Sequence, residues 1–293
     1  MSEASFGPEW SAAHRRGSDR ELRGWLDLAL RCCDEADGIA LRHFGGRLEI
    51  DRKGDGTLVT QADQAIERVL RERILAAYPG HGLIGEEYGP EAAGASVRWY
   101  LDPIDGTHNY VRGVPIFATL IAVERDDELQ VGVASAPALR QRWFAWRGGG
   151  AWTAPIAPGG TVGPAHEPWP GRRRHRLRVS AIADMAQASL VHGSLGAIIR
   201  AGLWEPLAGL MARAWRDRGF GDFWGHTLVA EGKAEAMIEI GLKPWDIAAL
   251  LVLVEEAGGR LTDAAGSRGV HLPEVVTSNG HLHRELLESL ARR

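Results

Sequence analysis

A short run of carboxylates at the end of an apolar stretch is the feature of this chain most able to do chemistry. The segment 99–110 reads WYLDPIDGTHNY, so Asp102 and Asp105 stand three positions apart with a proline and an isoleucine between them. A strand that ends in an Asp/Gly turn would explain such a sequence without any function. The alternative is a cation site, because crowded carboxylates repel each other unless positive charge neutralises them.

Other acidic residues also stand where one predicted element ends or the next begins. Glu86 and Glu87 follow an apolar run in LIGEEYG, and Asp246 stands at the start of a predicted helix in KPWDIAAL. At such positions carboxylates from distant parts of the chain can converge. The donor set has oxygen atoms and no Cys or His, which favours Mg²⁺ or Mn²⁺ over Zn²⁺. These residues therefore predict a site for Mg²⁺ or Mn²⁺.

The residues around the aspartate pair offer further groups to such a site. The backbone carbonyl of Ile104 could be an additional ligand, and Gly106 lets the backbone approach closely. Thr107 offers a hydroxyl group and an N–H. If a helix begins at this point, its free N–H groups would hold a phosphate.

The elements that must position these residues follow an α/β order. Apolar residues recur at helical spacing over 19–43 and again from Thr60 to the Pro79-Gly80 pair. Residues rich in β-branched and aromatic side chains then predict successive strands at 98–102, 117–123, 129–136 and 142–146. After a Gly/Pro-rich stretch, the predicted elements are a strand at 176–180, a helical region at 196–217, a helix near 224–232, a strand at 234–240, a helix at 245–257, and a closing strand and helix.

This order predicts a layered α/β sandwich with two lobes. We expect a tail over 1–18, a metal-binding lobe over 19–147 with a helix pair and a large sheet, and a C-terminal α/β lobe over 179–293 that carries substrate selectivity and the Trp-Asp motif. The aperiodic segment 148–178 is predicted to be a connecting excursion.

Composition excludes several classes of protein. The net charge of −4, with 45% hydrophobic and 25% charged residues, gives no reason to expect a nucleic-acid or membrane-surface partner. No secretory signal is apparent, and the longest aliphatic run, Ile247 to Val254, is too short to span a bilayer. Cys32 and Cys33 are neighbours in a predicted helix, which favours reduced thiols. We therefore expect a cytoplasmic protein.

Three motifs together resemble the inositol monophosphatase superfamily of Mg²⁺-dependent phosphomonoesterases. They are GEE, DPIDGT and WDIAALLVLVEEAGG, and the resemblance runs from about Leu22 to the C-terminus. It implies an α/β/α/β/α sandwich of the inositol monophosphatase and fructose-1,6-bisphosphatase type, usually assembled as a homodimer. It also implies two or three Mg²⁺ ions, for which Mn²⁺ could substitute.

The resemblance assigns roles to matching positions. The implied metal ligands are Glu86, Asp102, the Ile104 carbonyl, Asp105 and Asp246. Thr107 would act with Glu86 to activate the attacking water, Asp63 would support that threonine, and Lys53 would line the pocket. Five residues of these motifs are also predicted to bind the substrate: Asp105, Gly106, Thr107, His108 and Asp246.

A narrower resemblance concerns the substrate. The segments GDFWGHTLVAEG (221–232) and GVASAPALRQRWFAWRGGGAW (132–152) are similar to the branch that hydrolyses histidinol phosphate in histidine biosynthesis. That small phosphate ester carries an ammonium group and an imidazole, so a pocket for it requires carboxylates. The candidates to bind it are Glu239, Asp222 and Arg218.

Simpler interpretations and other functions stay open. Thr60 to Asp63 is also a helix-capping sequence, and Phe223 and Trp224 are more typical of a core than of a substrate platform. His226, like His108, falls in no ligand pattern, and the basic run 172–178 is typical of a solvated surface. The alternative function is a phosphatase for inositol monophosphate, a nucleotide 3′-phosphate or a sugar phosphate. A remoter one is a non-catalytic RNA-binding protein of the same fold.

Overall fold

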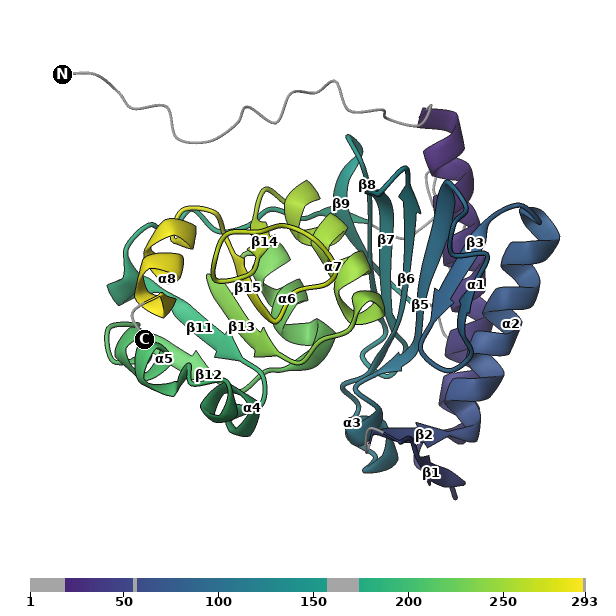
Figure 1. Cartoon of the computed structure of the whole chain (residues 1–293), viewed down its shortest axis with the longest axis horizontal. Coiled ribbons are helices and arrows are strands. Elements are labelled where there is room, and N and C mark those ends of the chain that lie inside the picture. The colour runs from purple at the N-terminus through teal and green to yellow at the C-terminus, as the bar shows by residue number, and fades with distance from the viewer. Residues whose placement is uncertain (1–18, 55–56, 157–173, 292–293) are drawn as a thin grey trace.

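The computed structural model describes residues 19–54, 57–156 and 174–291, which build five alternating layers of helices and sheets (Figure 1). Two long helices cover one face of an eight-stranded sheet, a second helix pair lies between that sheet and a five-stranded sheet, and three short helices cover the far side. This arrangement confirms the predicted α/β/α/β/α sandwich. The predicted tail, 1–18, lies outside the described residues.

The outer helix pair consists of α1 (Asp19–His43) and α2 (Gln61–Ala77). In α1 the buried residues recur every three or four positions and include both cysteines, which are free thiols. At the start of α2 the Thr60 hydroxyl accepts the N–H of Ala62, and Asp63 accepts the N–H of Thr60, so the predicted capping role is observed. Both helices bury their apolar faces against the large sheet.

The large sheet has the strand order β10-β9-β8-β7-β6-β5-β3-β4. Its strands are β3 (Gly82–Gly85), β4 (Gly89–Glu91), β5 (Val97–Asp105), β6 (Ala118–Arg125), β7 (Glu128–Ala136), β8 (Gln141–Trp146), β9 (Gly150–Pro155) and β10 (His175–Arg176). Helices cover both faces, which explains why the central strands are almost continuously apolar. The prediction for 148–178 was wrong at its ends, because β9 and β10 pair within this sheet; residues 157–173 lie outside the described part.

The second sheet has the order β12-β11-β13-β15-β14. Its strands are β11 (Ser189–His192), β12 (Arg216–Arg218), β13 (Ala236–Ile240), β14 (Arg260–Thr262) and β15 (Glu274–Ser278), and its outer face carries α4 (Leu195–Arg200), α5 (Trp204–Met211) and α8 (His283–Leu290). The predicted helical region 196–217 is therefore two helices followed by an edge strand. The strand predicted at 176–180 is wrong except at Arg176, where it overlaps β10.

The inner helices are α6 (Asp222–Ala230) and α7 (Pro244–Glu256). Residues Ile247 to Val254 of α7 are buried without a break, because this helix packs between the two sheets. One core cluster includes residues of α7, β6 and β15, so the two predicted lobes share a common interior. Smaller elements complete the chain: β1 (Ile50–Arg52), β2 (Leu58–Thr60), α3 (Thr107–Val111) and a single 3₁₀ turn (Met185–Gln187).

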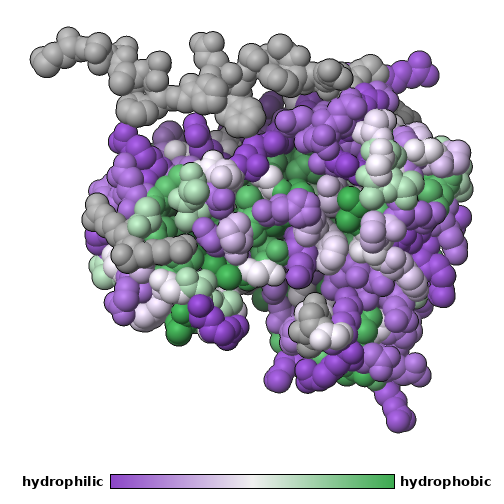
Figure 2. Space-filling model, in the orientation of Figure 1, coloured by the Kyte–Doolittle hydropathy of each residue, from purple (hydrophilic) through white to green (hydrophobic). Residues whose placement is uncertain are grey.

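The surface is mostly hydrophilic on the face shown in Figure 2, and its outline is indented between α4 and α3. The carboxyl end of β5 leads into α3, beside this indentation (Figure 1). Among the residues that the structure describes, no helix combines the length and apolarity needed to cross a membrane.

Candidate active site

A β-bulge places Asp102 and Asp105 together. Residues three apart on a regular strand point to opposite faces of the sheet. Here Asp102 pairs with Leu120 of β6 and Asp105 pairs with Ala118, so two residues of β5 oppose the single residue Thr119. The extra residue restores the alternation, and both aspartates can face the same side. Pro103 fits this bulge because it has no N–H to pair.

Glu86 reaches the same corner through the register of two parallel strands. Gly85 of β3 pairs with Leu101 of β5 in parallel register. The next residue on each strand is an acid, so Glu86 and Asp102 lie side by side. In open α/β sheets, sites commonly form where parallel strands end. Lys53 donates to both Glu86 and Glu87, with Nζ 2.7 Å from a carboxylate oxygen of each. The structure thus brings the predicted lysine to this site.

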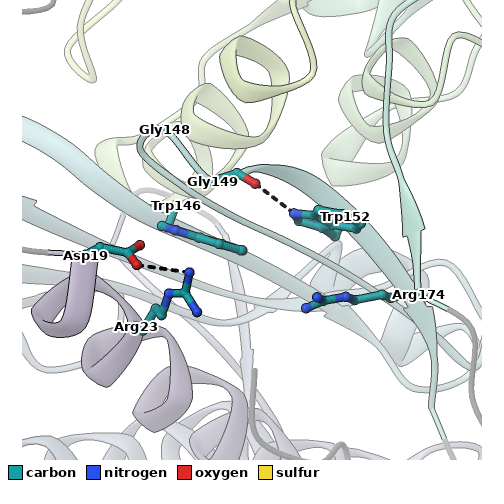
Figure 3. Close-up of a pocket in the computed structure, with 7 residues that line it drawn as sticks. All are labelled: Asp19, Arg23, Trp146, Gly148, Gly149, Trp152 and Arg174. Atoms are coloured by element: carbon teal, nitrogen blue, oxygen red, sulfur yellow. Dashed lines mark hydrogen bonds and ion pairs between the residues drawn. The ribbon is translucent and has the colours of Figure 1, made fainter. Parts of the chain in front are cut away.

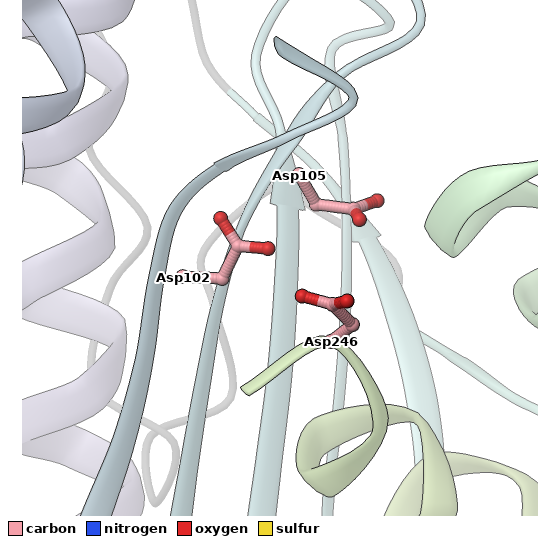
Figure 4. A group of neighbouring side chains, drawn as sticks. All are labelled: Asp102, Asp105 and Asp246. Atoms are coloured by element: carbon pink, nitrogen blue, oxygen red, sulfur yellow. The ribbon is translucent and has the colours of Figure 1, made fainter. Parts of the chain in front are cut away.

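Asp246 comes from the first turn of α7 and completes the group that we call the acidic corner, Asp102, Asp105 and Asp246. One carboxylate oxygen of each lies within 4.8 Å of those of the other two, and Figure 4 shows the three side chains converging. Pro244 stands in the first turn of α7, where its missing N–H costs nothing. Asp246 accepts the Lys243 N–H at 2.8 Å, which fixes its side chain.

The acidic corner has the electrostatics of a cation site. Burial, and then the charge of Glu86, raises the pKa of Asp102 well above its usual range. Burial and neighbouring carboxylates also raise the pKa of Asp105, and burial raises that of Asp246 to about 7. Asp102 Oδ1 is buried and has no hydrogen-bond partner among the described residues. Only oxygen donors meet here, so the residues fit a hard divalent cation such as Mg²⁺.

The turn after Asp105 brings a hydroxyl and several N–H groups to the corner. Gly106 has φ +83°, and a Cβ there would lie 3.0 Å from the Ile116 carbonyl oxygen, so glycine is required. Thr107 begins α3, and its hydroxyl donates to the Ile104 carbonyl at 2.9 Å. His108 is exposed on α3. The carbonyl predicted as a ligand therefore also accepts the hydroxyl of the predicted catalytic threonine.

Asp63 occupies a buried position at the start of α2. Its Oδ2 accepts both the N–H and the hydroxyl of Thr60, whereas Oδ1 is buried without a partner among the described residues. Burial raises its pKa to about 6, and the charge of Glu86 contributes. The structure records no hydrogen bond between Asp63 and Thr107. The capping role is thus observed, and the support of Thr107 stays a prediction.

Sequence reasoning missed Glu67, which is fully buried on α2. Its carboxylate accepts the N–H groups of Glu87 at 2.6 Å and Tyr88 at 3.2 Å, and Arg71 Nε donates to it at 2.8 Å. A Cβ at Gly85 would collide with this carboxylate. Glu67 therefore holds the turn that carries Glu86. A charged residue on the buried stripe of a predicted helix was the only indication of this role.

The predicted substrate-binding acids Asp222 and Glu239 meet where α6 begins. Asp222 has φ +57°, accepts a hydrogen bond from Asn109 Nδ2 at 3.0 Å, and has a pKa raised to about 6 by burial and by Glu239. Glu239 of β13 accepts the Asp222 N–H at 3.2 Å. Arg218 is exposed and donates to the Asp217 carbonyl; among the described residues it pairs with none of the site carboxylates.

The two aromatic residues of α6 have different environments. Phe223 is fully buried, with its ring centre 5.8 Å from that of Trp143. Its core position was the interpretation that the sequence favoured. Trp224 is half-buried and packs against Phe220, with ring centres 4.8 Å apart.

A separate pocket of about 320 Å³ lies at the opposite end of the large sheet. Figure 3 shows Trp146 and Trp152 of the β8–β9 hairpin beside the Asp19–Arg23 ion pair of α1 and Arg174. The strand directions require this separation. The acidic corner lies where β5 ends and β6 begins, whereas the β8–β9 turn lies at the opposite ends of the strands. The pocket shares no residue with the acidic corner.

A five-layer sandwich with carboxylates gathered at the carboxyl end of a central strand defines a class of metal-dependent phosphatases. Residues 21–293 match the model of the inositol monophosphatase family. The chain belongs to this family and is a phosphomonoesterase.

Relatives cover nearly the whole chain. A histidinol-phosphatase from Mycobacterium tuberculosis is 44% identical over 90% of this chain and 97% of its own length. A histidinol-phosphatase from Streptomyces coelicolor is 39% identical over 92% of this chain and 97% of its own. Among solved structures, the extragenic suppressor protein suhB from Bartonella henselae superposes with a TM-score of 0.80 at 26% identity, covering 92% of this chain and 99% of its own.

Proposed function

We propose that this enzyme hydrolyses histidinol phosphate to histidinol and inorganic phosphate with Mg²⁺ as cofactor. The observation that carries the substrate is the 44% identity to a histidinol-phosphatase across nearly the full length of both chains. The oxygen-only acidic corner supports the choice of metal. Histidine biosynthesis would be the pathway served.

The residues that would hold two or three Mg²⁺ ions are Glu86, Asp102, the Ile104 carbonyl, Asp105 and Asp246. Mn²⁺, which also accepts oxygen ligands, could replace them. Bound there, the ions would supply Lewis-acid activation of water and would neutralise charge on the phosphoryl and leaving oxygens. The orphaned Asp102 oxygen and the raised pKa values of all three aspartates support this assignment.

The chain's own groups would position the reactants. Thr107 and Glu86 would orient the water in line with the leaving oxygen and take up its proton, while Asp63 would support Thr107 through its unpartnered oxygen. The main-chain groups of Gly106, Thr107 and His108 would hold the phosphate. The water oxygen would form a bond to phosphorus as the ester P–O bond breaks, and the departing alkoxide would take a proton from a second water molecule. Catalysis of this kind consists of positioning and charge stabilisation.

Substrate choice would be made at the start of α6. Asp222 and Glu239 place two acids beside the acidic corner, where the ammonium group of histidinol would find charge complementarity. Arg218 stands at the end of the neighbouring strand β12, where it could reach a phosphate. An inositol ring has no cationic group to satisfy these acids, which favours histidinol phosphate over the broader alternative.

We also propose that the enzyme is a cytoplasmic homodimer. The two cysteines are free, as is usual in a reducing compartment. Burial raises the pKa of Cys32 to about 12, so this thiol stays protonated and unreactive. The family resemblance is the basis for expecting a dimer. Size-exclusion chromatography coupled to light scattering tests this expectation. The net charge of −4 favours neither nucleic acid nor a membrane surface as partner.

Phosphate release from a panel of esters with Mg²⁺ tests the proposed function. The panel is histidinol phosphate, inositol 1-phosphate, adenosine 3′,5′-bisphosphate and fructose 1,6-bisphosphate, with excess chelator as control. We expect a kcat/KM preference for histidinol phosphate of about a hundredfold, which corresponds to roughly 2.7 kcal/mol. A flat profile would contradict the substrate, and full rates in excess chelator would contradict the metal.

A further inference from the structure

His226 is a fully buried histidine that joins two strands of the five-stranded sheet to the site. It lies on α6, and its Nδ1 is 2.8 Å from the Thr277 hydroxyl of β15. Its Nε2 is 3.2 Å from Glu239 Oε2 on β13. With the proton on Nε2, the ring donates to the carboxylate and accepts from the hydroxyl. Both ring nitrogens are thus satisfied by groups of the sheet below α6.

Glu239 is buried, and both of its carboxylate oxygens accept hydrogen bonds from within the chain. Only 6% of its surface is exposed, His226 donates to one carboxylate oxygen, and the Asp222 N–H donates to the other. A Cβ at Gly193 would collide with the carboxylate, and one at Gly221 would lie 3.3 Å from it. Glu239 is therefore committed to internal contacts, which suits a residue that supports another group.

The group that Glu239 supports is Asp222. Its backbone lies in the left-handed region at φ +57°, which is unfavourable for a residue with a side chain. The hydrogen bond from its N–H to Glu239 compensates for this conformation, and Asn109 holds one oxygen of its carboxylate. The other oxygen has no partner among the described residues. Asp222 is more exposed than Glu239, so it is the better placed of the two to meet a substrate.

We propose that His226 is a positioning residue for substrate selectivity. Through Glu239 it holds Asp222 in the left-handed conformation that directs the Asp222 carboxylate to the organic part of the ester. This inference rests on the proposed function, in that the favoured ester carries a cationic group. It adds that the selectivity of the site depends on a histidine that never touches the substrate.

The test compares two ratios of rates in the Mg²⁺-loaded enzyme. For each variant, kcat and KM are measured with histidinol phosphate and with p-nitrophenyl phosphate, an aryl ester without a cation. His226→Leu should lose about tenfold or more of the preference for histidinol phosphate, mainly through KM, because a buried acceptor on Glu239 loses its donor. Rates on the aryl ester should change by no more than about twofold, since the acidic corner is untouched.

Three further variants separate positioning from folding. His226→Gln keeps a donor and an acceptor in nearly the same places and should restore most of the preference. Thr277→Val removes only the hydroxyl and should cause a smaller loss in the same direction. His283→Leu is the matched control, because His283 is also buried and bonds two hydroxyls, those of Ser278 and Thr262, without contacting the site. It should leave the ratio unchanged.

The outcomes of these measurements bear differently on the role of His226 and on the proposed substrate. A wild-type preference that His226→Leu and Thr277→Val both retain would overturn the role of His226 and leave the substrate assignment intact. A wild type that prefers another ester, with that preference lost in His226→Leu, would overturn only the substrate assignment. A wild type without preference would overturn both. Equal losses in His226→Leu and His283→Leu would reduce the effect to general destabilisation and contradict the inference.

Discussion

Asp105 Oδ2 accepts a hydrogen bond from the main-chain N–H of Phe223 at 2.7 Å, across 118 positions of the sequence. This bond joins the carboxyl end of β5, in the large sheet, to the first turn of α6. The preceding residue, Asp222, gives its own N–H to Glu239. A single turn of helix therefore connects the acidic corner with the acids proposed to select the substrate. A shift of α6 would be felt at both places.

Removing one carboxylate of the corner should stop turnover without unfolding the chain. Asp102→Asn should lower kcat/KM for histidinol phosphate by about a thousandfold or more, because Asp102 is proposed to serve more than one cation. The melting temperature in chelator should stay the same or rise, since a repelling charge has gone. Asp126→Asn, at an exposed turn, is the control and should be silent. Near-normal rates in Asp102→Asn would disprove the metal assignment.

Loosening the turn that carries Glu86 should weaken the metal site indirectly. Glu67→Gln replaces an acceptor of three hydrogen bonds with a group that also donates, so the turn at Glu86 and Glu87 loses its fixed position. We expect Mg²⁺ affinity or activity to fall about ten- to a hundredfold. Calorimetric titration with Mg²⁺ measures this directly. Glu72→Gln changes an exposed glutamate on the same helix, and equal effects in the two variants would count against the role of Glu67.

The chelated protein should lose stability as the pH rises. Asp246, with a pKa of about 7, and Asp222, with a pKa of about 6, bind protons more tightly in the folded chain than in the unfolded chain. The stability that these protons provide is complete below the unfolded-state pKa and is lost as the pH rises through the folded-state values. The melting temperature should therefore fall from about pH 4 to about pH 7, and it should be lower at about pH 8 than at about pH 5.

Magnesium should reverse this loss. At Mg²⁺ concentrations about a hundred times its Kd, binding would stabilise the fold by about 2.7 kcal/mol, and more strongly at the higher pH, where the ligands are ionised. Melting curves with and without Mg²⁺ at both pH values provide the measurement. A Mg²⁺-induced shift that is larger at about pH 5 would contradict the assignment of these aspartates as ligands.

Glu239→Gln should affect one substrate far more than another. Its amide would place a donor against the N–H of either Asp222 or His226, both of which now donate to the carboxylate. We expect kcat/KM to fall by about tenfold or more for histidinol phosphate and by about twofold or less for p-nitrophenyl phosphate. Equal losses on both substrates would move the selectivity site away from this part of the fold.

A buried ion pair between α1 and the large sheet should contribute to stability and not to catalysis. Arg142 of β8 is completely buried, and it contacts Asp37 of α1 at 2.5 Å and Asp34 at 2.9 Å. Asp37→Ala leaves the guanidinium poorly paired and should cost about 3–5 kcal/mol of unfolding free energy. Asp34→Ala, at the partly exposed partner, should cost less. Denaturant titration measures both, and kcat of the folded fraction should remain unchanged.

The sequence predicted the parts of the site that local patterns encode. DPIDGT and the acid at the start of the KPWD helix mark ends of elements, and ends of elements meet in a layered α/β fold. The bulge that turns Asp105 to the same side as Asp102 was not predictable, because it depends on pairing with β6. Glu67 and His226 were missed for a similar reason. Their partners, Glu87 and Glu239, lie on other elements, so no spacing along the chain indicates the contacts.

The large elements were predicted and the small ones were not. The periodic apolar stripe of α1 and the continuous apolar run of α7 extend over many residues, so local patterns identify both helices. The strand β9 was assigned to the aperiodic segment because glycines and prolines flank it, and its pairing with β8 overrides that local composition. The break between α4 and α5 at Gly202 has φ +73°, a turn that a pattern of apolar spacing does not reveal.

The complete burial of α7 bears on how this enzyme could be altered. A helix in contact with two sheets cannot slide or rotate without disturbing both, so Asp246 at its start is anchored to the interior of the whole molecule. The neighbouring α6 begins with the left-handed, half-buried Asp222, and Trp224 two positions later is also half-buried. Redesign for a different phosphate ester could therefore remodel the start of α6 while the hydrolytic chemistry stays on an immobile support.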